Sequence, residues 1–151
     1  MHLPSQDGAD RDGGGARVSV LRMPWNKLIK STQDLFNFYI RLRDKKRNRG
    51  LCFLCKRRPI YSANHFISAA NMGTRFEEDN ACGGCRQDNF NEFIDRRLVR
   101  KDFFRQKHIE MVGEARVLEL EDMARRITKL DRTDIAAIRK SLHDKISKLG
   151  G

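Results

Sequence analysis

The pattern of apolar residues predicts helices at both ends of the chain. Apolar side chains recur every three or four residues before Gly50, which predicts a helix within residues 17–50. The same spacing predicts two further helices, over residues 115–129 and 133–149. We expect their apolar stripes to pack on each other and on the core, or alternatively to form a homodimer interface. The stripes are Leu118, Leu120, Met123, Ile127 and Leu130, and then Ile135, Ile138, Leu142, Ile146 and Leu149.

The centre of the chain lacks this helical period. Residues 51–66 predict a knuckle followed by a short hairpin, with Ile60, Tyr61, Phe66 and Ile67 as strand residues. Another helix is expected from Asn89 to the break at Gly113. The predicted divisions are a flexible tail (1–16), a basic N-terminal helix (17–50), a core (51–105) and a C-terminal helical region (106–151).

The charge of the chain favours a polyanionic partner. It has 151 residues with 31 Lys and Arg against 20 Asp and Glu, a net charge of +11 and a pI near 10.0. Two basic clusters flank the predicted core, and we expect them to contact DNA phosphates without reading bases. They contain Arg41, Arg43, Lys45, Lys46, Arg47 and Arg49, and then Arg96, Arg97, Arg100 and Lys101. No signal segment or apolar stretch of membrane length is seen, so we expect a cytoplasmic protein without a membrane partner.

The cysteines predict a structural zinc ion, Zn²⁺. All four lie in two Cys-x-x-Cys pairs, Cys52/Cys55 and Cys82/Cys85, and two such pairs supply four thiolates to one tetrahedral ion. Reducing conditions in a cytoplasm disfavour disulfides as the alternative. Asp88 follows Cys85 by three residues and is a second candidate for the fourth ligand. Thiolate is the preferred ligand in closed zinc sites, so Cys82 is favoured over Asp88.

His65 is the candidate for chemistry. It follows a predicted strand between the two cysteine pairs, and a neutral imidazole can accept a proton from water that attacks a phosphodiester. Its neighbour Asn64 offers an amide oxygen suited to a hard divalent cation. The alternative is a histidine that only packs the hairpin. We expect His108 and His143 to be surface residues.

Three segments carry a family resemblance: residues 36–44 (FNFYIRLRD), 64–67 (NHFI) and 74–80 (TRFEEDN). With the cysteine pairs, they resemble the HNH (ββα-metal) endonucleases, and more narrowly the phage recombination endonucleases of the NinG (Rap) type. The resemblance covers about residues 25–130. It implies an α+β fold in which a small zinc-stapled ββα-metal core is flanked by N- and C-terminal helices.

The resemblance also implies roles for individual residues. The histidine at the place of His65 is the general base, and the asparagine at the place of Asn80 pins its loop. If Cys85 and Asp88 are the second ligand pair, Asn89 lies at the place of a catalytic-metal ligand, and Asn64 and Asn89 would bind Mg²⁺ or Mn²⁺. If Cys82 and Cys85 are the pair, that place falls on an arginine, which cannot bind a cation. Both registers remain open.

Three function classes follow from these features. The resemblance implies a metal-dependent endodeoxyribonuclease that hydrolyses phosphodiester bonds in branched recombination intermediates such as Holliday junctions, in the host cell cytoplasm if the protein is phage-encoded. The main alternative is a non-catalytic, zinc-containing DNA-binding or recombination accessory protein, which would not need His65, Asn80 and Asn89 together. An RNA-binding zinc protein is a third class that charge alone permits.

Overall fold

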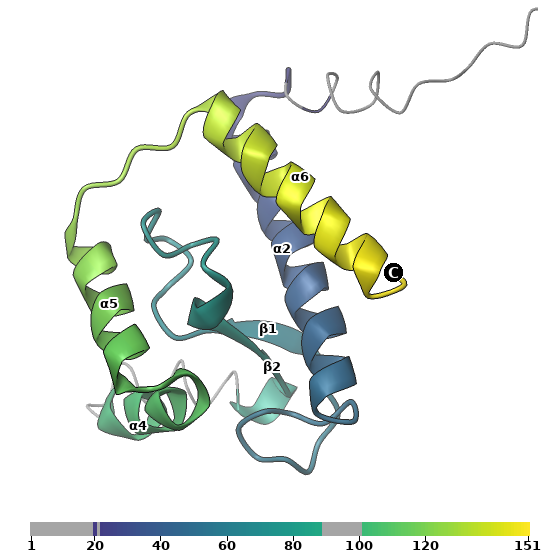
Figure 1. Ribbon diagram of the computed structural model, residues 1–151, viewed down its shortest axis with the longest axis vertical. Coiled ribbons are helices and arrows are strands. Elements are labelled where there is room, and N and C mark those ends of the chain that lie inside the picture. The colour runs from purple at the N-terminus through teal and green to yellow at the C-terminus, as the bar shows by residue number, and fades with distance from the viewer. Residues whose placement is uncertain (1–19, 21, 89–100) are drawn as a thin grey trace, which may run out of the picture.

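The computed structural model describes residue 20, residues 22–88 and residues 101–151, and it has an α+β fold (Figure 1). A two-stranded sheet lies among the helices, which confirms the predicted class of fold. The elements are α2 (Trp25–Arg47), β1 (Ser62–His65), the 3-10 turn η1 (Glu78–Asn80), β2 (Ala81–Gly84), α4 (Lys101–Val112), α5 (Glu114–Arg125) and α6 (Arg132–Lys148).

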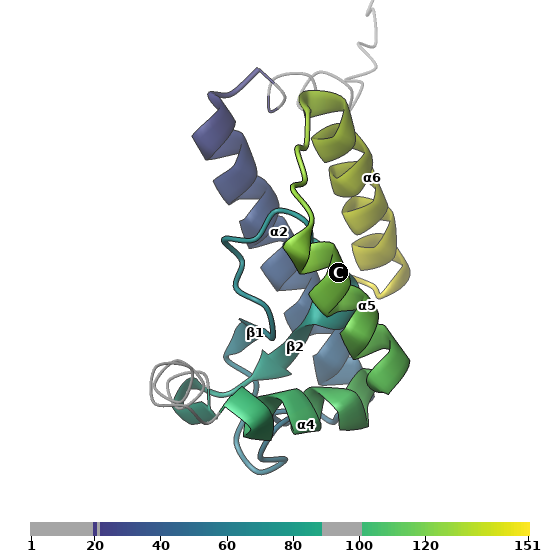
Figure 2. The ribbon, with the colours of Figure 1, turned by 90° about the vertical axis from the view of Figure 1, so that its left-hand side faces the viewer.

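Helices α2 and α6 lie side by side and enclose the main core (Figures 1 and 2). Phe36 and Ile40 of α2 are fully buried, and they pack in one cluster with Leu142 and Ile146 of α6. Burying each such side chain stabilises the fold by roughly 1.5–3 kcal/mol. The N-terminal helix and the last helix, far apart in sequence, thus form one layer that covers the sheet.

The start of α6 is fixed by a capping box. The side chain of Asp131 accepts a hydrogen bond from the backbone N–H of Asp134 at 2.8 Å, and the side chain of Asp134 accepts from the backbone N–H of Asp131 at 2.9 Å. The reciprocal bonds satisfy two amides that the first turn of a helix leaves unpaired. Gly113, with φ +90, separates α4 from α5 at the predicted break.

The sheet differs from the predicted hairpin. Strand β1 pairs antiparallel with β2, from Ser62 opposite Gly84 to His65 opposite Ala81. Within the predicted hairpin only a single bridge forms, between Leu51 and Pro59. The intervening residues turn around the first cysteine pair, so the strand partner comes instead from the segment after η1.

Two glycines in β2 permit close packing on both sides of the sheet. A Cβ on Gly83 would lie 2.8 Å from Cδ1 of Ile60, and a Cβ on Gly84 would lie 2.2 Å from Nδ2 of Asn64. The backbone N–H of Gly83 also donates to the buried carboxylate of Asp44 at 2.7 Å. Glycine at both positions therefore serves the packing of the sheet.

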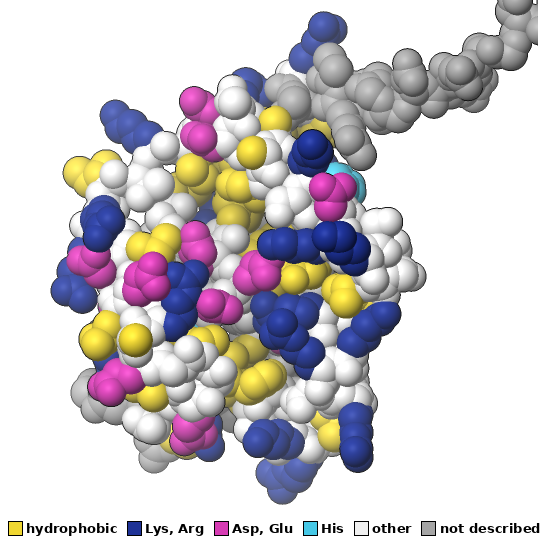
Figure 3. Space-filling view, in the orientation of Figure 1, with side chains coloured by type: hydrophobic (Ala, Val, Ile, Leu, Met, Phe, Trp, Pro, Cys, Tyr) yellow, Lys and Arg dark blue, Asp and Glu magenta, His cyan; other side chains and the backbone are white. Residues whose placement is uncertain are grey.

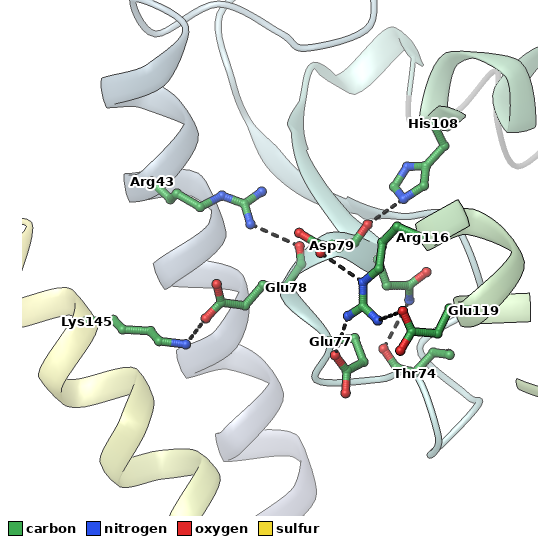
Figure 4. Close-up of polar contacts among 10 residues, drawn as sticks. Arg43, Thr74, Glu77, Glu78, Asp79, His108, Arg116, Glu119 and Lys145 are labelled. Carbon is green, nitrogen blue, oxygen red and sulfur yellow. Dashed lines mark hydrogen bonds and ion pairs between the residues drawn. The ribbon is translucent and has the colours of Figure 1, made fainter. Parts of the chain in front are cut away.

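The acidic turn around η1 joins the sheet to helices on both sides (Figure 4). Arg116 of α5 makes ion pairs with Glu77 and Asp79, each at 2.9 Å. On the opposite side, Lys145 of α6 pairs with Glu78. The turn thus ties α5 and α6 to the start of β2 and holds the sheet in place between them.

The last helices bury only part of the predicted stripes. Val117 and Leu120 of α5 are fully buried, whereas Leu118 is 50% exposed and Ile127, beyond the end of α5, is 94% exposed. Helix α5 ends at Arg125, before the predicted limit of residue 129. The prediction of packing on the core was therefore wrong at Leu118 and Ile127, while the homodimer interface stays a prediction. No helix among the described residues is long and apolar enough to cross a membrane.

His108 is buried, so the prediction of a surface histidine was wrong for it, while His143 is exposed as expected. The His108 ring stacks on Phe66 at a centroid distance of 4.7 Å, and its Nε2 donates to the backbone carbonyl of Asp79. Burial lowers the pKa of His108, and the bond to Asp79 opposes that shift only in part.

This burial predicts a pH-dependent stability. Because the folded protein resists protonating His108, the unfolded chain binds more protons below the ordinary pKa of about 6.5, and stability falls as pH decreases from there. We expect the urea midpoint to fall less between pH 7.5 and 5.5 for His108→Gln, whose amide can still donate to Asp79, than for the wild type. His143→Gln is the control and should behave as wild type. Equal pH slopes for wild type and His108→Gln would contradict the prediction.

Candidate metal centre and histidine site

Four side chains converge beside the end of β2 and form a candidate metal centre. The ligand atoms of Cys52, Cys55, Cys85 and Asp88 all lie within 4.8 Å of one another. Oδ2 of Asp88 is 3.2 Å from the sulfurs of both Cys52 and Cys85, and the sulfurs of Cys55 and Cys85 are 4.0 Å apart. In the part of the chain described, no other group of three or more His, Cys, Asp or Glu converges in this way.

The first cysteine pair is held by a tight backbone turn. The N–H of Cys52 donates to the carbonyl of Arg58 at 2.7 Å, and the N–H of Lys56 donates to the carbonyl of Cys52 at 2.9 Å. Lys56 adopts φ +56, so the chain reverses immediately after Cys55. This reversal places both thiols of the pair on the same side of the turn, facing Asp88.

Burial and hydrogen bonds shift the pKa values of the cysteines and the aspartate in the cluster. Burial raises the pKa of the Cys52 thiol to about 12. Burial acts in the same direction on Cys55, but backbone N–H groups at residues 57–58 outweigh it and leave the pKa of Cys55 below its usual value. The pKa of Asp88 is also lowered, because donation from the thiols of Cys52 and Cys85 outweighs the effect of burial. A bound metal would replace these thiol protons.

Cys82 lies outside the cluster, which corrects the preferred four-cysteine set. It is a strand residue of β2, 5% exposed and paired with Asn64 across the sheet. Strand β2 pairs with β1 as far as Gly84, so Cys82 is part of the sheet. Cys85 comes directly after the strand and can reach the cluster. Asp88, the alternative candidate, takes the fourth place in the cluster.

Three thiols and one carboxylate oxygen suit a divalent metal such as zinc. Zinc accepts sulfur and carboxylate ligands in four-coordinate sites. The sulfur ligands disfavour magnesium or calcium, which require oxygen. The residues present therefore fit a zinc ion bound by Cys52, Cys55, Cys85 and Asp88.

His65 lies at the end of β1, where helix α2 faces it. Its ring is 5.7 Å from the ring of Phe36, between centroids, and its Nε2 is 3.3 Å from the amide nitrogen of Gln33. The ring is half-buried, so it both packs on the core and reaches the surface. Such a position is compatible with proton transfer and also with simple packing.

Asn80 braces the loop that follows His65. Its side chain accepts from the N–H of Ile67 at 2.8 Å and donates to the carbonyls of Ile67 at 2.9 Å and Thr74 at 3.2 Å. Asn80 is fully buried, and its own carbonyl accepts from the N–H of Phe66. These contacts hold the loop after His65 to the start of β2, and the role that the resemblance implies for Asn80 stays a prediction.

The described residues do not assemble a site for a catalytic divalent ion. Asn64 is 2% exposed, and its Oδ1 already accepts from the hydroxyl of Ser62 at 2.8 Å. Successive strand residues point to opposite faces, and Asn64 packs against Gly84 while His65 faces α2. Asn89, the other expected ligand, lies outside the described residues.

The predicted DNA-binding residues divide into two groups. Arg43 is 6% exposed and donates to the carboxylate of Asp44 and to the carbonyls of Glu78 and Ala81, so it braces the fold and is not free to meet DNA. Arg41 is half-buried. The exposed members at the end of α2 are Lys45, Lys46, Arg47 and Arg49.

The side chains of the second predicted basic cluster lie outside the described residues. Arg96, Arg97 and Arg100 and the side chain of Lys101 are not among the described residues. Around the first cysteine pair, however, Lys56, Arg57 and Arg58 are exposed beside the end of α2. Figure 3 shows Lys and Arg side chains gathering on the side of α2 and α6, with Asp and Glu mainly on the side of α5.

Two residues beside His65, Gln33 and Arg75, were not predicted as site residues. Gln33 is a buried polar residue of α2, and Arg75 lies in the loop before η1. Nε of Arg75 donates to Oε1 of Gln33 at 2.7 Å, and the amide of Gln33 faces His65. Gln33 could have been noticed in the sequence as a polar residue on the apolar face of its helix. The sequence marks Arg75 only by its place in the TRF segment.

The family of the chain follows from a comparison over nearly its full length. The model of a family described as Bacteriophage Lambda NinG protein matches residues 9–150. The chain belongs to this family. The NinG match covers the cysteine cluster, His65, Asn80 and all the described helices. No curated protein and no solved structure matches the chain.

Proposed function

We propose that the protein is a metal-dependent endodeoxyribonuclease of the HNH type that cleaves branched recombination intermediates. Membership of the NinG family supports a role in phage recombination. The observation that carries the nuclease proposal is the placement of His65: a half-buried imidazole at a strand end, with its loop braced by Asn80 and its Nε2 facing a fixed amide.

His65 acts as the general base in this proposal. Gln33 presents its amide nitrogen to Nε2 of His65, since its oxygen is held by Arg75, and so a neutral His65 ring carries its proton on Nδ1. Nε2 is then the nitrogen that accepts a proton. At 3.3 Å the contact with Gln33 is long, and an attacking water can compete for the same lone pair.

The proposed protein binds two metals, a structural zinc and a catalytic divalent ion. Zinc at Cys52, Cys55, Cys85 and Asp88 staples the turn after Gly50 to the end of β2. The divalent ion, Mg²⁺ or Mn²⁺, is included because HNH enzymes use one to neutralise charge on the phosphate. Asn64 and Asn89 remain the proposed ligands of this ion on the basis of the resemblance alone. To bind it, Oδ1 of Asn64 would have to give up its hydrogen bond from the Ser62 hydroxyl.

DNA binding rests on the exposed basic side chains at the end of α2 and around the first cysteine pair. Lysines and arginines in such positions contact phosphates, so binding should weaken steeply with salt and depend little on sequence. A second copy of the chain, joined through the C-terminal helices, is part of the proposal because a four-way junction presents two symmetric strands.

A non-catalytic DNA-binding protein is the second candidate. The observation that favours it is that Asn64 is buried with its Oδ1 bonded to Ser62, in contrast to the well-formed cysteine cluster. Such a protein would keep the zinc and the basic surface and would use His65 only for packing against Phe36.

Cleavage of labelled DNA by the purified protein distinguishes the two candidates. Four-way, forked and linear duplexes are incubated with Mg²⁺, with Mn²⁺ or without added ion. We expect nicking of the branched substrates only with the added ion, and weaker cutting of the linear duplex. Binding of all three substrates without cleavage under any condition would reject the nuclease proposal in favour of the DNA-binding protein.

A further inference from the structure

Arg75 is a partly buried cation without an acidic partner among the residues that the structure describes. Burial lowers its pKa, and no carboxylate contributes to that shift. Two other arginines at or near η1 do have acidic partners: Arg43 is paired with Asp44, and Arg116 with Glu77 and Asp79. A guanidinium that is desolvated without an anion is costly unless something else supplies the negative charge.

The contacts of Arg75 fix its guanidinium in one orientation. Nε donates to Oε1 of Gln33 at 2.7 Å, and the guanidinium carbon lies 5.8 Å from the centroid of the Phe76 ring. Within the described part of the chain, its terminal Nη nitrogens make no hydrogen bond. One edge of the guanidinium is thus held while the other keeps the two-pronged geometry that matches phosphate oxygens.

Gln33 connects this cation to His65 through a single amide group. Because arginine only donates, Oε1 of Gln33 must face Arg75, and its amide nitrogen must face Asn37 and His65. The distances are 2.9 Å to Oδ1 of Asn37 and 3.3 Å to Nε2 of His65. The contacts thus fix the orientation of the Gln33 amide, with Arg75 at its oxygen and His65 at its nitrogen.

We propose that Arg75 binds a DNA phosphate beside His65, held in position by Gln33. This inference rests on the proposed function, since it places the phosphate next to the general base. Arg75 supplies positive charge to the phosphate through its Nη nitrogens, and Gln33 sets the spacing between that phosphate and the imidazole. The site thereby gains a protein cation beside the general base.

The test combines a cleavage measurement with a binding measurement that needs no cleavage. Arg75→Ala should lower kcat/KM on a four-way junction by about 10²-fold or more, the typical cost of removing a donor from a charged transition state. In a His65→Ala background, adding Arg75→Ala should weaken DNA binding and reduce the salt slope of log Kd by about one, as expected for one lost phosphate contact. Arg75→Lys, which keeps the charge, should retain the slope and part of the activity.

Arg139 is the matched control. It is also half-buried with a pKa lowered by burial, but its guanidinium donates to the hydroxyls of Ser31 and Thr32 between α2 and α6. Arg139→Ala should leave the salt slope unchanged. An Arg75→Ala protein that keeps the wild-type kcat/KM and salt slope would overturn the inference even if His65 proves essential. A reduced slope in a protein that never cuts DNA would reject the nuclease proposal and leave the phosphate contact standing.

Discussion

Replacing His65 by alanine is expected to abolish DNA cleavage while leaving DNA binding intact. A general base contributes about 10²–10⁴-fold to a hydrolytic rate, so the variant should fall to the detection limit of a sensitive assay. Folding should survive, because the half-buried ring makes its packing contact with Phe36 at the edge of the core and the loop after it is held by Asn80. The measurements are single-turnover nicking of a four-way junction and the Kd for the same junction.

His143 is the matched control for this change. It is an exposed histidine of α6, so His143→Ala removes the same side chain without touching the site and should cut at the wild-type rate. His65→Gln adds a second comparison, since an amide preserves some packing but cannot accept a proton at neutral pH. If His65→Ala or His65→Gln still cuts at the wild-type rate, the imidazole is not the base and its role is packing.

The helices were predictable because their signals are local. The capping residues Asp131 and Asp134 lie three positions apart, and Gly113 interrupts the chain at a single position. Their effects depend on neighbouring residues alone, which a sequence displays directly. The apolar period likewise identified α2 and α6, although it could not tell that Ile127 would stay exposed beyond the end of α5.

The site was less predictable because its parts meet only through the tertiary fold. Asp88 joins the cysteine cluster because β2 extends to Gly84 and includes Cys82 in the sheet. The pairing of β1 with β2 joins segments that are distant in sequence, so no local sequence pattern predicts it. Arg43 looked like one more basic residue of a charged helix end, yet its position on the buried face of α2 directs it to Asp44. A charge count cannot separate a bracing arginine from one that meets DNA.

Replacing Cys85 by serine is expected to remove the bound metal and to unfold the centre of the protein. Structural zinc sites contribute apparent binding free energies of roughly 10–16 kcal/mol at pH 7, comparable to the whole stability of a small domain. Cys85 follows β2 directly and its sulfur lies within 4.8 Å of the other three ligand atoms, so its loss opens the cluster. Metal content by mass spectrometry and the thermal unfolding midpoint measure the two effects, and both should drop sharply.

The fourth ligand is decided by comparing Asp88→Asn with Cys82→Ser. Asp88→Asn should weaken zinc binding, because a neutral amide replaces the carboxylate whose Oδ2 lies 3.2 Å from two of the sulfurs. Cys82→Ser should keep one zinc per chain and lose only the modest stability of a buried strand thiol, about 1 kcal/mol. The opposite result, zinc lost from Cys82→Ser and kept by Asp88→Asn, would show that the bound state uses the four-cysteine register. Since that register would require Cys82 to leave its place opposite Asn64, it would also mean that metal binding rearranges the sheet beside His65.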